Sequence, residues 1–310
     1  MSKIKVGTFN VENLFLRYKL MKFERGSIGK PKPVSMDKFK VRGHINMLGW
    51  ELDDFGPISK SVRRLTAKVV LESDADVLAL QEVENLEALI QFNRKYLKNA
   101  YPYMMVVDGN DPRQIDVGVL SRFDLRGVRT HRFEPVPSPP NQRIFSRDCL
   151  EVELELPGNS SLTVLVNHFK SKIGGGAEKR KRQATRVSKI LEERFGKQLK
   201  GNFVVAGDLN AGNSEAELRP ILQSLENVVE RLPKADQWTH YYKKTKAAEQ
   251  LDYLLLSPAL AKKNPHALPQ IERRGLGNDI DYYSGPRFNA SISGSEGASD
   301  HCPVFIELNV

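Results

Sequence analysis

Short apolar runs recur along the chain, and most of them are too short to be helices. They predict strands at residues 4–9, 77–80, 103–107, 117–121, 150–156, 162–168, 203–206, 254–256 and 304–308. Apolar residues at helical spacing predict helices at residues 61–72, 86–96 and 178–195. Two sheets packed face to face, with helices outside, would bury this many apolar runs. We therefore expect an α/β (α+β) four-layer sandwich of two mainly antiparallel or mixed β-sheets flanked by helices.

The sequence shows no internal repeat and no linker rich in Gly, Pro or Ser, so we expect a single domain over residues 1–310. At 310 residues and 40% hydrophobic content, the chain can bury a large core. Residues 16–60 are rich in Lys, Gly and Pro and are expected to be a basic insertion within the domain. This insertion is either a lid or arm beside a binding cleft or a surface loop that packs on the scaffold.

The positive charge is concentrated in two stretches. Residues 17–42 hold nine Lys and Arg against two Asp and Glu, and residues 170–200 hold eleven against three, although the whole chain carries only +9. Clustered cations favour binding of a polyanion such as a phosphate backbone. Residues 178–195 also read as an amphipathic helix whose basic residues form its solvated face, so charge alone leaves both interpretations open.

Composition also bears on the compartment. No apolar run approaches the ~20 residues of a membrane span, and the first residues lack the pattern of a signal peptide. Cys149 and Cys302 each lie in a strand-like run, which favours buried thiols over a disulfide or a metal site. We expect a cytoplasmic protein with no membrane partner, with export as the alternative, and the sequence indicates no obligate protein partner.

Polar side chains recur at the ends of the predicted strands. They are Asn10, Glu12, Glu82, Asn167, His168, Asp208, Asn210, Asp252, Asp300 and His301. One such residue is usually a helix cap or turn residue, but six such places in one chain favour chemistry. Mg²⁺ prefers carboxylate and amide oxygens, and five of these residues supply them: Glu82, Asp208, Asp300, Asn10 and Asn210. The sequence shows no His/Cys cluster with the spacing of a zinc site.

Strand geometry separates the roles of Asp300 and His301. Neighbouring side chains in extended backbone point to opposite faces, so Asp300 is poorly placed to orient His301. A histidine that acts as general base needs a carboxylate on its other ring nitrogen, and Asp252, on a different strand, can supply one. Asp208 and Asn210 are two residues apart and are expected to share a face.

Six motifs carry a resemblance to a known family. TFNVEN, LQEVEN, VNHFKSK, GDLN, LDYLLLS and ASDHCPV occur in this order over almost the whole chain. Each motif alone is weak, but the ordered set resembles the endonuclease/exonuclease/phosphatase superfamily, the fold of pancreatic deoxyribonuclease. The resemblance implies a divalent cation, Mg²⁺ or Mn²⁺, with Glu82 as its principal ligand, Asn10 nearby and Asp300 in a metal-linked role.

The resemblance also implies catalytic roles. Asp208 would orient the attacking water or activate it with His301, and Asp252 would partner His301. Asn210 would contact the scissile phosphate, and His168 would stabilise the phosphorane or protonate the leaving oxygen. A structural histidine at a strand end remains the alternative for His168.

The resemblance also implies that Arg147 binds backbone phosphate, and Asn167 and Lys170 are expected to bind substrate phosphate beside it. For Arg147 the alternative is an ordinary ion pair with an acidic neighbour. Residues 277–291 interleave Tyr282, Tyr283 and Phe288 with arginine, a composition that suits either base stacking or core packing.

The sequence thus predicts a metal-dependent nuclease that acts on DNA, with RNA as a further substrate, and that has modest sequence specificity because phosphate contacts position without specifying. One alternative keeps the chemistry but takes inositol phosphates, phospholipid headgroups or nucleotides, as a phosphatase or phosphodiesterase. A second alternative is a catalytically silent nucleic-acid-binding module on the same fold.

Overall fold

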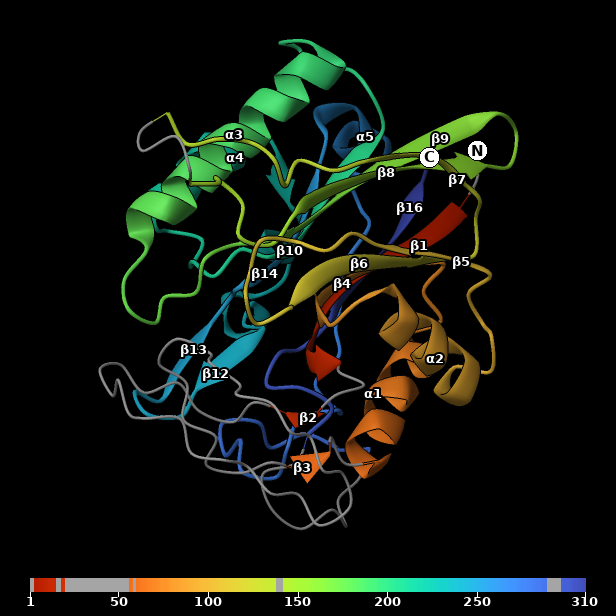
Figure 1. Ribbon diagram of the computed structural model, residues 1–310, viewed down its shortest axis with the longest axis vertical. Helices are drawn as coiled ribbons and strands as arrows, with labels where there is room; N and C mark the ends of the chain where they lie inside the picture. Colours follow the sequence, from red (N-terminus) through yellow and green to blue (C-terminus); the bar gives the residue numbers. More distant parts are fainter. Residues whose placement is uncertain (1–2, 15–17, 20–55, 58–59, 138–141, 289–296) are drawn as a thin grey trace, which may run out of the picture. The chain divides into compact units, whose positions relative to one another are not determined.

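The computed structural model describes residues 3–14, 18–19, 56–57, 60–137, 142–288 and 297–310 (Figure 1). The strands are β1 (Lys3–Leu14), β2 (Tyr18–Lys19), β3 (Gly56–Pro57), β4 (Val77–Val83), β5 (Tyr103–Val106), β6 (Asp116–Ser121), β7 (Leu125–Arg129), β8 (Cys149–Leu156), β9 (Ser160–His168), β10 (Phe203–Asp208), β11 (Glu226–Asn227), β12 (His240–Tyr242), β13 (Ala247–Glu249), β14 (Asp252–Leu256), β15 (Gln270–Ile271) and β16 (Val304–Asn309). The α-helices are α1 (Lys60–Ser73), α2 (Leu86–Tyr96), α3 (Ala177–Phe195), α4 (Arg219–Leu222) and α5 (Pro258–Lys263).

The chain divides into two compact units, Met1–Phe15 with Lys60–Val310, and Leu16–Ser59. In the second unit the structure describes only the short antiparallel pair β2 and β3. The basic stretch at residues 17–42 lies almost wholly outside the described residues, so its role stays a prediction, as do the single domain over residues 1–310 and the insertion over residues 16–60.

Two six-stranded sheets form the framework of the first unit. One has the order β15-β16-β1-β4-β6-β5 and the other β11-β14-β10-β9-β8-β7. Each sheet contains one parallel pair, β1 with β4 and β9 with β10, among antiparallel neighbours. This mixed arrangement, with helices outside, confirms the fold class predicted from the sequence (Figure 1).

Strand alternation explains the layers. Side chains that alternate along each strand fill one core between the sheets, which includes Val6, Val77, Val164, Val204 and Leu254. The intervening side chains fill two outer cores. One lies under α1 and α2, and the other lies under α3 and α4 (Figure 1). Both faces of the central strands are therefore apolar.

The inner rows of side chains end in polar residues at one end of the two sheets. On β9 the row Leu162, Val164, Val166 continues to His168, and on β10 the row Val204, Ala206 continues to Asp208. By the same alternation, Asp252 begins the inner row of β14 and Asn10 extends that of β1. The apolar core between the sheets thus gives way to a buried polar cluster.

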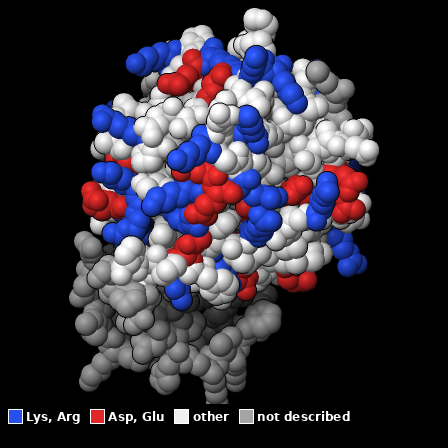
Figure 2. Space-filling model, turned by 90° about the horizontal axis from the view of Figure 1, so that it is seen from above, with Lys and Arg blue, Asp and Glu red and all other residues white. Residues whose placement is uncertain are grey.

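The basic stretch at residues 170–200 forms α3 and the loop before it, and much of its charge is balanced. Three arginines of α3 lie within 3.1 Å of carboxylates: Arg180 with Glu217, Arg186 with Glu134 and Glu193, and Arg194 with Glu151 and Glu153. Figure 2 shows the corresponding face, with Asp and Glu between the Lys and Arg side chains. Both readings of the basic helix therefore remain open.

The structure also describes the two cysteines, the aromatic residues near the C-terminus and the lengths of the helices. Cys149 and Cys302 are free, buried thiols, as expected. Tyr283 lies under Arg287, and Tyr282, which is 51% exposed, stacks on Tyr241. None of the helices in the described ranges is long and apolar enough to cross a membrane.

Candidate active site

Asp208 is the centre of the buried polar cluster. Its Oδ2 accepts hydrogen bonds from Asn10 Nδ2 at 3.2 Å and Asn210 Nδ2 at 3.0 Å. Two imidazoles also face this oxygen, His168 Nε2 at 3.4 Å and His301 Nε2 at 3.8 Å. Residues from four separate segments therefore converge on one carboxylate, and all five are at most 9% exposed.

Asn210 reaches Asp208 through a turn. The strand β10 ends at Asp208, and Asn210 has a left-handed backbone with φ 50°. Asparagine tolerates this conformation because its short side chain hydrogen-bonds locally. Here the Asn210 backbone N–H donates to Asp208 Oδ1 at 2.9 Å, while the side chain also donates to Phe169 O. The two residues meet, as expected, but by this turn and not by strand alternation.

His301 is held by Asp252 from the neighbouring sheet. Its Nδ1 lies 2.8 Å from Asp252 Oδ2, and since a carboxylate can only accept, Nδ1 carries the proton. Thr239 Oγ1 donates to the same oxygen at 2.7 Å and accepts from the backbone N–H groups of Leu251 and Asp252. The other ring nitrogen of His301, Nε2, then faces the interior of the cluster.

The loop that carries His301 is tied to the end of β1. Ser299 Oγ donates to Asn10 O at 2.7 Å and accepts from the backbone N–H of His301 at 3.0 Å. The backbone N–H of Asp300 donates to Glu12 Oε2. These contacts fix the loop before β16 relative to Asn10, although almost 290 residues separate the two segments in sequence.

Glu82 is turned toward the cluster by an irregularity in β4. The inner row of β4 contains Val77, Ala79 and Gln81, so regular alternation would point Glu82 outward. The pairing with β6 shifts register between Gln81 and Val83, and Glu82 has φ 65°. Such bulges re-aim a side chain. Burial raises the pKa of Glu82, and Asp300 raises it further, against the opposing effect of His168.

The two histidines differ in their electrostatic surroundings. Burial lowers the pKa of His301, but the carboxylates of Asp252, Asp208 and Asp300 outweigh it and hold this pKa well above the ordinary value. Burial and then Arg147 lower the pKa of His168, which keeps this imidazole neutral at neutral pH. The His168 Nδ1 is buried and has no hydrogen-bond partner among the described residues.

The three residues expected to bind phosphate lie in different surroundings. Arg147 is 2% exposed, with Nε 3.0 Å from Asp111 Oδ2 and Nη1 3.0 Å from Phe169 O, the carbonyl that Asn210 also contacts. Lys170 is half-buried, and its Nζ donates to two carbonyls of the following loop. Asn167 is fully buried and donates to Leu165 O. Alternation points it to the face of β9 opposite His168, so the structure does not bring it into the cluster.

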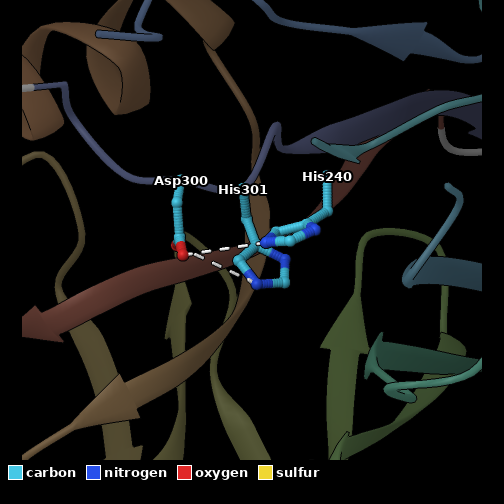
Figure 3. A group of neighbouring side chains, drawn as sticks. All are labelled: His240, Asp300 and His301. Atoms are coloured by element: carbon cyan, nitrogen blue, oxygen red, sulfur yellow. Dashed lines mark ion pairs between the residues drawn. The ribbon is translucent and has the colours of Figure 1, made fainter. Parts of the chain in front are cut away.

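His240 is a neighbour of the site that the sequence analysis missed. It forms an isolated β-bridge with His301, and the two ring centroids are 4.7 Å apart. Asp300 lies to one side of both imidazoles, 3.8 Å from His240 Nε2 and 4.0 Å from His301 Nε2 (Figure 3). Thr239, the hydrogen-bond donor to Asp252, was missed too. The motif that contains both, WTHYY, carries no periodic signal of its own.

Comparison with known proteins places this geometry in a family. Residues 49–310 match the sequence model of the endonuclease/exonuclease/phosphatase family. The chain belongs to this family. The resemblance drawn from the six motifs is thereby confirmed, and members of the endonuclease/exonuclease/phosphatase family are metal-dependent hydrolases of phosphate esters. No curated protein sequence matches the chain significantly.

Solved structures show the same fold. Truncated TDP2 from Caenorhabditis elegans has 16% identity and a TM-score of 0.62, over 99% of this chain and 98% of that one. An endonuclease/exonuclease/phosphatase from Bacteroides vulgatus has 12% identity and a TM-score of 0.61, over 100% of both chains. The human nocturnin catalytic domain has 15% identity and a TM-score of 0.61, over 99% and 94%. At these identities the likeness concerns the fold alone.

For a member of the endonuclease/exonuclease/phosphatase family, the donor set suits a hard divalent cation. Glu82 is buried, and Asp300 lies close enough to raise its pKa further. Asn10 Oδ1 accepts one hydrogen bond from the Glu12 backbone N–H and has a second lone pair. Two carboxylates and an amide oxygen are ligands that Mg²⁺ and Mn²⁺ accept.

Proposed function

We propose that this protein is a divalent-cation-dependent phosphodiesterase that hydrolyses the nucleic-acid backbone, with DNA as its first substrate and modest sequence specificity. One observation carries the proposal. The buried carboxylate of Asp208 faces two histidines, His168 and His301, and two amides. The other ring nitrogen of His301 lies 2.8 Å from Asp252. Such a set can activate a water and stabilise charge on a phosphorane at the same place.

In the proposed mechanism, His301 is the general base. Asp252 fixes its tautomer and raises its basicity, and Thr239 holds Asp252 in position. Asp208, 3.8 Å from His301 Nε2, orients the attacking water between them. In-line attack then builds charge on the equatorial phosphate oxygens, which need hydrogen-bond donors and cations around them.

Asn210 and His168 are the proposed donors to the phosphate. Both side chains now donate toward Asp208 Oδ2, and both lie on the inner face of the cluster. The lowered pKa of His168 favours stabilisation of the phosphorane by a neutral imidazole over protonation of the leaving oxygen. Arg147 contacts the same Phe169 carbonyl as Asn210, and Lys170 is the next residue along the chain. Both add positive charge to this part of the proposed site. Because Asn167 faces away from the cluster, we leave it out of the proposal.

Glu82, Asn10 and Asp300 are proposed to hold the cation, Mg²⁺ or Mn²⁺. The raised pKa of Glu82 reflects burial of a carboxylate near a second one, which a bound cation would relieve. When bound, a divalent cation polarises the phosphoryl oxygen and offsets developing charge. The remaining chemistry belongs to the side chains of the protein.

The choice of nucleic acid rests on charge and on rings near the site. Lys and Arg exceed Asp and Glu by nine over the chain, which suits a polyanion better than a small phosphate ester. Tyr242, which is 41% exposed, lies 6.1 Å from the His240 ring, so an aromatic surface begins beside His301. Bases stack on such rings. The two buried free thiols agree with a reducing compartment, and the cytoplasm is the proposed location.

The experiment is a digest of supercoiled plasmid with Mg²⁺ or Mn²⁺, with and without EDTA. We expect cation-dependent nicking, and a loss of at least ~10²-fold in rate for His301→Ala because a general base contributes about that much. His266→Ala, at an exposed histidine outside the cluster, is the matched control. Nicking that survives His301→Ala unchanged would refute the assigned base.

The same preparation should be offered phosphomonoesters, inositol phosphates, nucleotides and sphingomyelin. Turnover of one of these without nicking of plasmid or RNA would replace the nuclease proposal by a phosphatase or phosphodiesterase acting on small or lipid substrates. Nucleic-acid binding without turnover of any substrate would indicate a silent binding module.

A further inference from the structure

We propose that His240, Asp300 and His301 form a second metal site, selective for a borderline transition-metal ion such as Zn²⁺, which shares Asp300 with the proposed Mg²⁺ ligands Glu82 and Asn10. The three residues come from β12 and from the loop before β16, and their ligand atoms all lie within 4.8 Å of one another. Figure 3 shows both imidazoles directed toward the Asp300 carboxylate.

The spacing is close to what a tetrahedral ion needs. Zinc bonds of about 2.0–2.2 Å place neighbouring ligand atoms roughly 3.3–3.6 Å apart. Here Asp300 Oδ2 is 3.8 Å from His240 Nε2, and Asp300 Oδ1 is 4.0 Å from His301 Nε2. The two distances involve different oxygens of Asp300, and its side chain is 50% exposed, so we expect it to rotate toward a bound ion. The exposed carboxylate also gives an ion access from solvent and leaves a position for water.

The surroundings of His301 favour a metal ligand. Histidines that bind metal usually donate their other ring N–H to a carboxylate, which fixes the tautomer and raises ligand basicity. Asp252 does this at His301 Nδ1, so Nε2 is left as the donor atom.

The chemistry of the donors distinguishes this site from the proposed cation site. Two imidazole nitrogens and one carboxylate suit Zn²⁺ and its transition-metal neighbours, whereas Mg²⁺ prefers an all-oxygen shell. The triad therefore selects a different ion from the one that Asp300 would hold together with Glu82 and Asn10.

The consequence for activity rests on the proposed function. A Zn²⁺ ion on His301 Nε2 would occupy the lone pair that the general base needs, so micromolar zinc should inhibit a Mg²⁺-dependent reaction. Removal of His240 should relieve this inhibition, because it removes one ligand of the zinc site without touching Asp252, Asp208 or Glu82.

The test is direct titration of the purified protein with Zn²⁺ alone, by calorimetry or by competition with a chromophoric chelator. We expect one ion per chain, and a loss of at least ~10-fold in affinity for His240→Gln and for Asp300→Asn, since even indirect partners of a metal ligand contribute that much. His266→Gln, at an exposed histidine, should bind zinc like the wild type. Cys302→Ala tests the neighbouring thiol, which is buried.

Unchanged zinc affinity in His240→Gln would overturn the site. A loss of zinc affinity in Cys302→Ala or Asp208→Asn alongside it would show that the ion binds elsewhere in the cluster. Nicking of plasmid in Mg²⁺ should be the same for His240→Gln and wild type, and only the wild type should lose at least ~10-fold in rate with added zinc. Zinc binding that requires His240 but leaves cleavage unaffected would support the metal site and refute the role of His301 as base.

Discussion

Asp252→Asn should move the pH profile of the reaction in a direction that the structure fixes. The Asp252 carboxylate lies 2.8 Å from His301 Nδ1 and is one of three carboxylates that hold the pKa of His301 well above its ordinary value. The base is active when it is deprotonated, so the acidic limb of kcat/KM should lie above pH ~6.5 in the wild type. Removing the negative charge favours the neutral ring, and the limb should move to lower pH.

The size of this movement follows from the distance. Two unit charges 2.8 Å apart interact by roughly 6 kcal/mol at an effective dielectric constant of about 20, or about 4 pKa units, which is an upper bound because both charges are delocalised. Asp208 and Asp300 remain at 3.8 and 4.0 Å from Nε2 and keep part of the effect. We therefore expect a shift of about 1–3 units. The maximal rate should fall about 10²- to 10⁴-fold, because the tautomer is no longer fixed.

The assay is the pH dependence of kcat/KM on a chromogenic phosphodiester such as bis(4-nitrophenyl) phosphate at saturating Mg²⁺. The control is Asp76→Asn. It removes a carboxylate that binds the Lys5 N–H and Arg122 at the start of β4, and the acidic limb should stay in place. A limb that stays in place or moves to higher pH in Asp252→Asn would refute the reasoning about His301.

Three further perturbations test the site and its framework. Thr239→Val should lower the free energy of unfolding, measured by chemical denaturation, by roughly 2–5 kcal/mol, because two buried N–H donors lose their acceptor. Thr239→Ser keeps the hydroxyl and should restore most of this free energy. Equal stability of the two variants would contradict the expectation. Glu82→Gln should raise the Mg²⁺ concentration for half-maximal activity at least ~10-fold and abolish the rise in melting temperature on Mg²⁺ addition. Unchanged Mg²⁺ dependence in this variant would contradict the role of Glu82 as a ligand. Gly207→Ala should cost roughly 3–6 kcal/mol, because its Cβ would lie 1.9 Å from Asn167 O at φ 143°, whereas Gly127→Ala, with its nearest atom at 3.8 Å, should be nearly neutral in the same unfolding measurement.

The fold could be predicted because most of its strands are short apolar runs, which are too short to be interpreted as helices. The helix predicted at residues 86–96 has the same bounds as α2, and the strand predicted at residues 162–168 lies within β9. Two-residue strands such as β11 and β15 were missed, since two residues cannot show a period. Their pairing is set by the neighbouring strands β14 and β16.

The site was predicted less completely, and the reasons are local. On β9 both faces are buried, so apolar residues occupy both rows and nothing in the pattern says whether Asn167 or His168 faces the core between the sheets. At Glu82 the alternation rule gives the wrong face, because the bulge before Val83 is not encoded in the apolar pattern. His240 meets His301 through a bridge between segments 61 positions apart, which periodicity cannot detect.

The position of the site follows from how the sandwich ends. Interior rows from both sheets must meet solvent somewhere, and in this chain they end in carboxylates, amides and imidazoles that satisfy one another: Asp208 with Asn10 and Asn210, and Asp252 with His301. Burying these charges is costly unless they are paired. The same contacts that orient the side chains for hydrolysis therefore also lower the free-energy cost of burying charge at this end of the core. Substitutions that remove the polar group at Asp208 or Asp252 should therefore affect stability as well as rate, whereas variants that keep a polar partner, such as Asp252→Asn, separate the two effects.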